Sequence, residues 1–136
     1  MQLSSTSRYS IRILSYIASK DKDKLYSAKE ISEALVIPYK YLTKIMTDLA
    51  KADLILSIRG REGGYKLARE ASQIVISDIL NVCNQSISDT ECILGGVCDS
   101  EHKCSLHDQW VDPKDMIKKM FNETTLDNLE GQNFKM

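Results

Sequence analysis

The sequence of 136 residues contains no hydrophobic run that approaches the roughly 18 residues needed to span a membrane. Its first residues lack the basic segment followed by an apolar segment that marks a secretory signal. Histidine is scarce as well. Only His102 and His107 are present, both close to cysteines, which leaves a cysteine-nucleophile enzyme without a separate general base. We therefore expect a cytoplasmic protein that is not an enzyme, with one core that needs no disulfide.

The formal net charge of -1 hides two halves of opposite sign. Residues 1–70 hold 13 Lys and Arg against 8 Asp and Glu, whereas residues 71–136 hold 5 against 11. A basic half attracts a phosphate backbone, because each neutralised phosphate releases condensed counterions. The charge distribution thus indicates a DNA-facing first half, although solvated charges distributed by chance would give the same count.

Helical periodicity in the first half predicts a helix-turn-helix. After a helix over residues 7–19, Ser27 and Glu30 form a capping box that opens a short helix whose apolar face is Ile31, Ala34 and Leu35. Pro38 then makes the turn and can occupy the first position of a third helix, over residues 39–52. Its inner face would be Leu42, Ile45, Met46 and Leu49. The outward face carries Tyr39, Lys40, Thr43, Lys44 and Thr47, which suits a helix in the major groove.

A β-hairpin is predicted directly after the third helix. Two β-prone runs, residues 54–59 and 65–67, flank the glycine-rich segment 60–64. Arg59 and Arg61 lie at its tip, and arginine suits a narrow, electronegative minor groove. The expected fold is therefore mainly helical, with a small β-hairpin wing on a winged helix-turn-helix formed by residues 1–70.

Residues 71–136 are expected to complete one compact domain with the first region. A helix beginning near Ser77 would carry Cys83 in its last turn as a small buried side chain. A last helix, over residues 105–122, is apolar along one side at Trp110, Met116 or Ile117, Met120 and Phe121. With no partner left in the chain, this side predicts the seam of a homodimer, the symmetry that a palindromic operator favours.

Cys92, Cys98, Cys104 and His107 form the pattern Cys-x5-Cys-x5-Cys-x2-His in an irregular loop, about residues 84–104. In a reducing compartment such a cluster indicates metal or redox chemistry rather than structural disulfides. The wide spacings suit an iron-sulfur core better than the tight knuckles of zinc sites. Zinc, and a metal-free switch based on reversible disulfides, stay open as alternatives. Gly95 and Gly96 could offer amide donors to cluster sulfur.

These residues together resemble the IscR/NsrR/CymR family of bacterial winged-helix regulators. The resemblance rests on residues 3–9, 37–42, 59–69 and 104–110, and it covers nearly the whole chain. It implies a homodimer, a palindromic double-stranded DNA operator and control by cluster state. The cluster-assembly branch matches best, since there a histidine placed like His107 is the fourth ligand of a [2Fe-2S] cluster. The nitric-oxide-sensing branch holds a [4Fe-4S] cluster with an acidic ligand near the amino terminus, and this chain has none before Asp21.

The expected sites follow. The metal ligands are Cys92, Cys98, Cys104 and His107, and the cofactor is an iron-sulfur cluster, [2Fe-2S] in preference to [4Fe-4S]. The expected DNA contacts are Arg8, Ser27, Tyr39, Lys40, Tyr41, Thr43, Lys44, Arg59 and Arg61.

Overall fold

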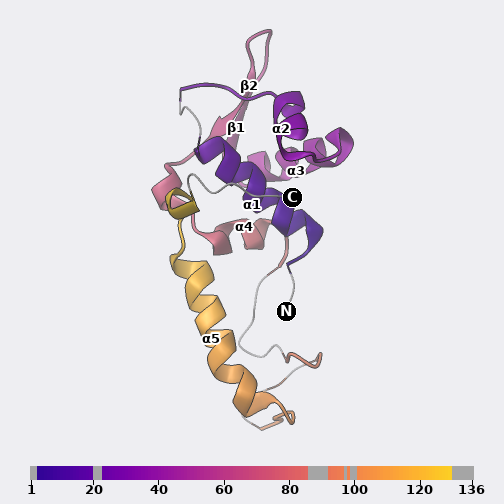
Figure 1. Cartoon of the computed structure of the whole chain (residues 1–136), viewed down its shortest axis with the longest axis vertical. Helices are drawn as coiled ribbons and strands as arrows, with labels where there is room; N and C mark the ends of the chain where they lie inside the picture. The colour runs from indigo at the N-terminus through magenta and orange to yellow at the C-terminus, as the bar shows by residue number, and fades with distance from the viewer. Residues whose placement is uncertain (1–2, 20–22, 86–91, 97, 99–100, 130–136) are drawn as a thin grey trace.

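The computed structural model describes residues 3–19, 23–85, 92–96, 98 and 101–129. Figure 1 shows a helical body, with a β-hairpin at one end of the long axis and a helix leading away toward the other. In chain order the elements are α1 (Ser5–Ala18), α2 (Ala28–Leu35), α3 (Tyr39–Lys51), β1 (Ile55–Ile58), β2 (Gly64–Leu67), η1 (Ala71–Gln73), α4 (Ile76–Val82), α5 (His107–Glu123) and η2 (Leu126–Leu129). The predicted class, mainly α with one hairpin, is confirmed.

The core lies between α1, α3 and α4. From α1, Ile13 and Leu14 are fully buried. The predicted inner face of α3 is confirmed, because its four apolar side chains are at most 3% exposed: Leu42, Ile45, Met46 and Leu49. Burying one such side chain contributes about 1.5–3 kcal/mol, so this stripe, rather than helix propensity, holds α3 against the body.

The turn between α2 and α3 departs from the sequence expectation in two details. Pro38 is the N-cap of α3, one residue before the helical position predicted for it, while Ala34 is exposed rather than part of the buried face of α2. Val36 ends α2 in the left-handed region at φ 55°. This conformation turns the chain so that Ile37 enters the core, 2% exposed. A β-branched residue there is strained, since its Cβ crowds the following carbonyl.

The hairpin pairs β1 with β2 in antiparallel register, from Ile55 opposite Leu67 to Ile58 opposite Gly64. Tyr26 extends the pairing on the other side, exchanging two backbone hydrogen bonds of 3.0 and 2.8 Å with Tyr65. Gly64 passes so close to Tyr26 that an added Cβ would lie 2.9 Å from its carbonyl oxygen. The glycine therefore allows the hairpin to lie against the segment before α2.

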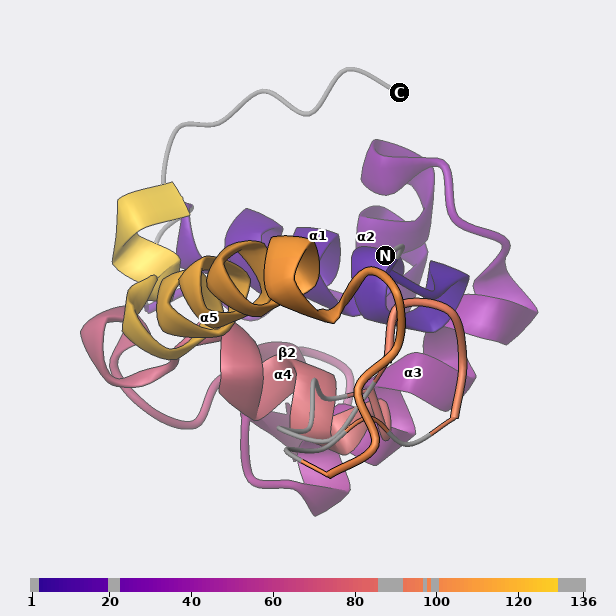
Figure 2. The same cartoon turned by 90° about the horizontal axis from the view of Figure 1, so that it is seen from below.

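The chain leaves the body at the cysteine segment and returns to it along α5 (Figures 1 and 2). The return is fastened at η2, where Leu126 donates to the Ile74 carbonyl at 2.9 Å and is fully buried. Helix α5 begins at His107, two residues later than predicted. No helix within the described ranges is both long and apolar enough to cross a membrane.

Two apolar predictions in this half were wrong in detail. The apolar residues of α5 do not share one side: Met116 is 72% and Met120 51% exposed, whereas Trp110, the alternative Ile117 and Phe121 are half-buried. Cys83 is the C-cap of α4 and only half-buried, with its thiol 3.4 Å from Ser10 Oγ. Sequence periodicity identified these residues as apolar without separating the side of α5 that faces the body from the side that faces solvent.

Candidate functional site

The outward side of α3 forms a polar face beside the turn. Tyr39 and Tyr41 are 56% and 43% exposed, and Lys40 and Lys44 are exposed as well. Thr43 is half-buried, and its hydroxyl donates to the Lys40 carbonyl at 3.0 Å. With helix α2 and a three-residue turn before it, this face has the geometry of a recognition helix.

The hairpin tip carries two exposed arginines, Arg59 and Arg61, between β1 and β2. Gly63 donates to the Gly60 carbonyl at 3.1 Å, which closes the loop, and Gly60 adopts φ 122°. A Cβ at Gly63 would lie 2.1 Å from the Ile58 carbonyl oxygen. The glycines thus permit a tight turn that leaves both guanidinium groups in solvent, available to a phosphate or a groove.

The remaining two residues expected at DNA lie at helix starts. Arg8 is exposed in the first turns of α1, and its guanidinium donates to Ser5 Oγ at 3.2 Å. Ser27 is also exposed, but its hydroxyl oxygen caps α2 by accepting from the Glu30 amide at 3.0 Å. The capping role was predicted from the sequence; DNA contact by Arg8 and Ser27 stays a prediction.

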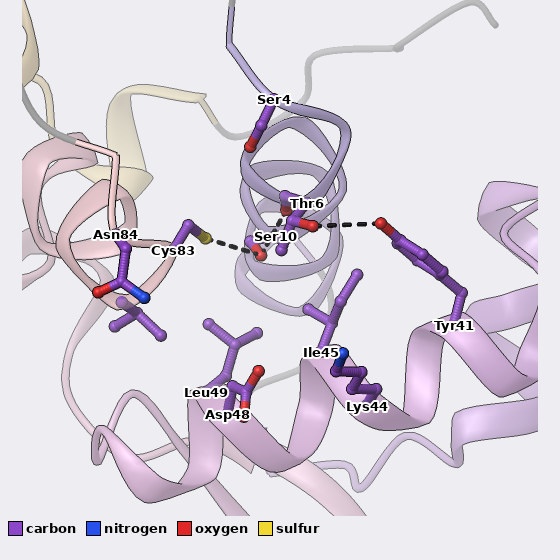
Figure 3. A pocket seen from close by; sticks show the side chains of 11 residues that line it. Ser4, Thr6, Ser10, Tyr41, Lys44, Ile45, Asp48, Leu49, Cys83 and Asn84 are labelled. Atoms are coloured by element: carbon purple, nitrogen blue, oxygen red, sulfur yellow. Dashed lines mark hydrogen bonds between the residues drawn. The ribbon is translucent and has the colours of Figure 1, made fainter.

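Tyr41 is held by α1 (Figure 3). Its hydroxyl lies 3.2 Å from Thr6 Oγ1, and its ring meets Tyr9 edge to face, with centroids 5.7 Å apart. Edge-to-face aromatic pairs contribute about 0.5–1.5 kcal/mol beyond their buried area. The first turns of α1 therefore fix one side chain on the outward face of α3, a contact that no sequence pattern indicated.

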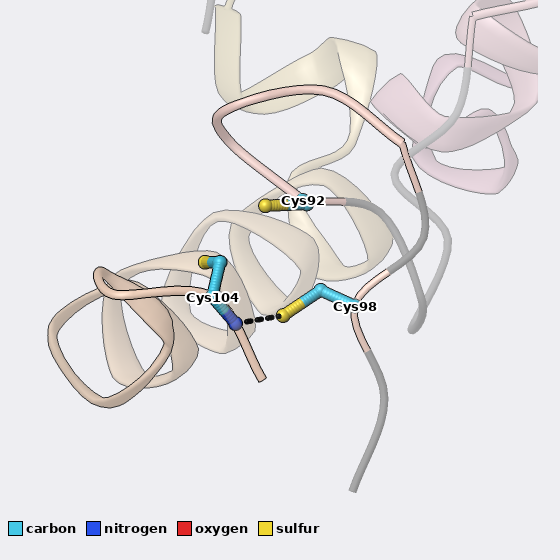
Figure 4. A group of neighbouring side chains, drawn as sticks. All are labelled: Cys92, Cys98 and Cys104. Carbon is cyan, nitrogen blue, oxygen red and sulfur yellow. Dashed lines mark hydrogen bonds between the residues drawn. The ribbon is translucent and has the colours of Figure 1, made fainter. Parts of the chain in front are cut away.

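The three cysteines predicted as ligands come together at the start of α5 (Figure 4). The sulfur atoms of Cys92, Cys98 and Cys104 all lie within 4.8 Å of one another. Cys92 and Cys98 are buried, at 6% and 5% exposure, and Cys104 is half-buried. Cys98 Sγ also accepts from the Cys104 amide at 3.3 Å. Much of the predicted loop, residues 86–91, 97 and 99–100, lies outside the described residues.

His107 adjoins this group through Cys98, whose sulfur lies 3.1 Å from His107 Nδ1. Position 107 is the first residue of α5, and the amide of His107 donates to the Cys104 carbonyl at 3.1 Å, so helix formation brings the imidazole next to the thiols. Gly95 and Gly96 adopt φ 96° and 85°. The Gly95 amide already donates to the Cys92 carbonyl at 2.9 Å, so it closes a turn instead of pointing at sulfur as the sequence suggested.

Trp110 carries an orphan donor one helical turn after His107. Its indole Nε1 is buried and has no hydrogen-bond acceptor among the described residues. In an α-helix, residues three apart share a face, and side chains lean toward the amino-terminal turn, so the indole and the imidazole lie on the same side of α5. A buried donor without a partner costs about 1–3 kcal/mol, which a sulfur acceptor in this region would offset.

Comparison with known proteins agrees with this arrangement. The family profile described as "Rrf2: Iron-dependent Transcriptional regulator" matches residues 3–131. The HTH-type transcriptional regulator IscR of Cronobacter sakazakii is 31% identical over 129 residues, covering 95% of this chain and 80% of that protein. The solved structure of CymR, the global cysteine regulator of B. subtilis, has a TM-score of 0.81 at 29% identity and 95% coverage of both chains. For T. potens IscR the TM-score is 0.73 at 26% identity, covering 95% of this chain and 85% of that one. The described architecture is thus a winged helix, and the chain belongs to the Rrf2 family of DNA-binding transcriptional regulators.

Proposed function

We propose that this regulator binds a palindromic operator as a homodimer and that an iron-sulfur cluster controls this binding. Cys92, Cys98 and Cys104 would hold the cluster, with His107 as the fourth ligand. The single observation that carries the proposal is the convergence of three thiol sulfurs within 4.8 Å at a point where no secondary structure requires it.

The residues present fit such a group. Thiolates are the ligands that iron-sulfur centres use, and a histidine nitrogen beside them completes a mixed set of four. Burial of Cys92 and Cys98 keeps water from part of the site, and the Trp110 indole, which has no acceptor among the described residues, would supply a donor for sulfur. When bound, the cluster would supply one-electron redox chemistry and lability to oxidants. The histidine argues for the [2Fe-2S] type, as in the cluster-assembly branch that the sequence resembles.

The effect of cluster ligation on operator affinity would have to be passed on by the chain's own residues. The cysteines gather at the start of α5, and α5 begins at the end of the long axis opposite the β1–β2 hairpin (Figure 1), so the described ligands are remote from the hairpin arginines. The cluster must therefore control DNA binding through the conformation of the protein. A loop whose thiols are ligated is held in one conformation, and operator affinity changes only as far as the cluster favours that conformation over the cluster-free one.

The proposed dimer seam is the solvent-facing side of α5. Met116 and Met120 stand four residues apart, hence on one face, and both are more than half exposed. Exposed apolar residues at this spacing on a 17-residue helix suit pairing with the same helix of a second copy. A Met116→Glu variant is expected to shift the protein to a monomer in sedimentation equilibrium, while Asn122→Glu, on another exposed position of α5, stays dimeric. A dimeric Met116→Glu protein would place the seam elsewhere.

The experiment for cluster control begins with anaerobic purification, absorption spectra and analysis of iron, sulfide and zinc. Iron with matching sulfide is expected in the wild type and in Cys83→Ser, whose thiol lies outside the triad, and is expected to be lost in Cys98→Ser. Operator affinity of the loaded and cluster-free forms is then compared at one salt concentration, because DNA affinity is strongly salt-dependent. Equal affinities in the two forms would contradict the proposal, and zinc in place of iron would make the site structural.

A second candidate function is a metal-free thiol switch, favoured by the likeness to Staphylococcus aureus CymR, which was solved in an oxidized form. Sulfurs within 4.8 Å can approach to form a disulfide after modest movement. Colourless, iron-free protein from anaerobic cells, together with operator binding that changes on oxidation and recovers with dithiothreitol, would support this alternative instead.

A further inference from the structure

Gln85 is bonded to the start of α1 although 78 and 81 residues of sequence separate it from its partners. Its side-chain oxygen accepts from the Ser4 amide at 2.9 Å and from Ser7 Oγ at 2.6 Å. The backbone amide of Gln85 donates to the Leu80 carbonyl at 2.9 Å, which anchors Gln85 to the end of α4. Gln85 therefore joins the exit of α4 to the N-cap of α1.

The same turns of α1 touch the recognition helix with another side. Tyr9 contacts the Tyr41 ring as described above. Figure 3 shows the other two contacts of these turns, Thr6 with the Tyr41 hydroxyl and Cys83 with Ser10. The first two turns of α1 are thus bound at one side to the segment just before the cysteine loop and at another to the outward face of α3. Because these contacts all lie within the same two turns of α1, a shift of that segment would move them together.

Gln85 is also the last described residue before the cysteine segment, seven residues ahead of Cys92. We propose that Gln85 is a positioning residue that couples the cysteine loop to α3 through α1, setting the orientation of Tyr41. This inference rests on the proposed function, because it names the route by which the state of the cysteines reaches the operator.

The test compares two substitutions of nearly equal size. Gln85→Met removes the acceptor oxygen, whereas Gln85→Glu retains one in the same place. Gln73→Met serves as a control, because Gln73 is an exposed glutamine in η1. Each protein is loaded with cluster or left cluster-free, and the ratio of operator dissociation constants between the two forms is measured at fixed salt. Amide NMR spectra of the cluster-free proteins report on Ser4, Thr6 and Tyr41.

We expect Gln85→Met to reduce the affinity ratio by about fivefold, the lower end of typical coupling between sites, with iron content unchanged. Its Ser4, Thr6 and Tyr41 resonances should shift together, while Gln85→Glu and Gln73→Met keep the wild-type ratio and spectra. An unaltered ratio in Gln85→Met, or a Tyr41 resonance that does not move, overturns the proposal. If the wild-type ratio itself is one, cluster control fails, and the Tyr41 resonance alone decides whether Gln85 positions α3.

Discussion

The substitution Leu126→Ala tests whether η2, which follows α5, belongs to the winged-helix core. Leu126 lies in η2, after α5, yet it is fully buried in the same cluster as Ile74 and the α1 residues Ile13 and Leu14. Helix α5 therefore starts at the cysteines and ends at the DNA-binding body. We expect residues 1–70 and 71–136 to unfold as one unit because this contact closes the core.

The expected cost of Leu126→Ala is about 3–5 kcal/mol, in the upper part of the range for buried leucines. The reason is local rigidity: the Leu126 amide is bonded to the Ile74 carbonyl at 2.9 Å, and the Ile76 amide to the Thr124 carbonyl at 3.0 Å. Backbone held in this way cannot move in to fill the cavity. Leu129→Ala, at a half-buried position of the same turn, should cost less than half as much.

The assay is urea unfolding followed by circular dichroism and by Trp110 fluorescence, at one protein concentration because dimerisation shifts apparent stability. Coincident transitions for the two probes in the wild type would show one cooperative unit. A decrease in the free energy of unfolding below about 1 kcal/mol for Leu126→Ala would refute the reasoning, since replacing a buried leucine in a rigid site by alanine costs about 2–5 kcal/mol.

Three further outcomes are expected. Arg61→Gln should lower the slope of log affinity against log salt by about 0.9 in operator titrations, because one phosphate contact is lost, and an unchanged slope would remove the Arg61 side chain from the interface. Val36→Gly should raise the free energy of unfolding by about 1 kcal/mol, since glycine adopts φ 55° without strain, and a lower melting temperature would contradict this account of the turn. Trp110→Phe should leave iron binding intact but lower the cluster potential, on the order of 60 mV if about 1.4 kcal/mol is lost on reduction. Identical potentials in voltammetry would show that the indole serves packing alone.

Local patterns in the sequence were sufficient for the helices, the hairpin and the grouping of Cys92, Cys98 and Cys104. The helix-turn-helix could be read because Leu42, Ile45, Met46 and Leu49 repeat at the helical period, and the hairpin because β-prone runs flank glycines. The cysteine triad was predictable because thiols in one short irregular segment have few uses other than a shared centre. These features depend on neighbours within a few residues along the chain.

Only the tertiary structure decided which contacts join distant segments. The sequence did not indicate that Gln85 bonds Ser4 and Ser7 or that Leu126 closes the core, because both depend on how α1, α4 and η2 meet. Periodicity also could not assign Met116 and Met120 to the exposed side of α5 and Phe121 to the side that packs against the core, since burial of an apolar residue is favourable within the chain or against a second copy. The residue types of the site were thus predictable from local sequence, whereas the contacts of Gln85 with α1 and of Leu126 with the core depend on tertiary packing.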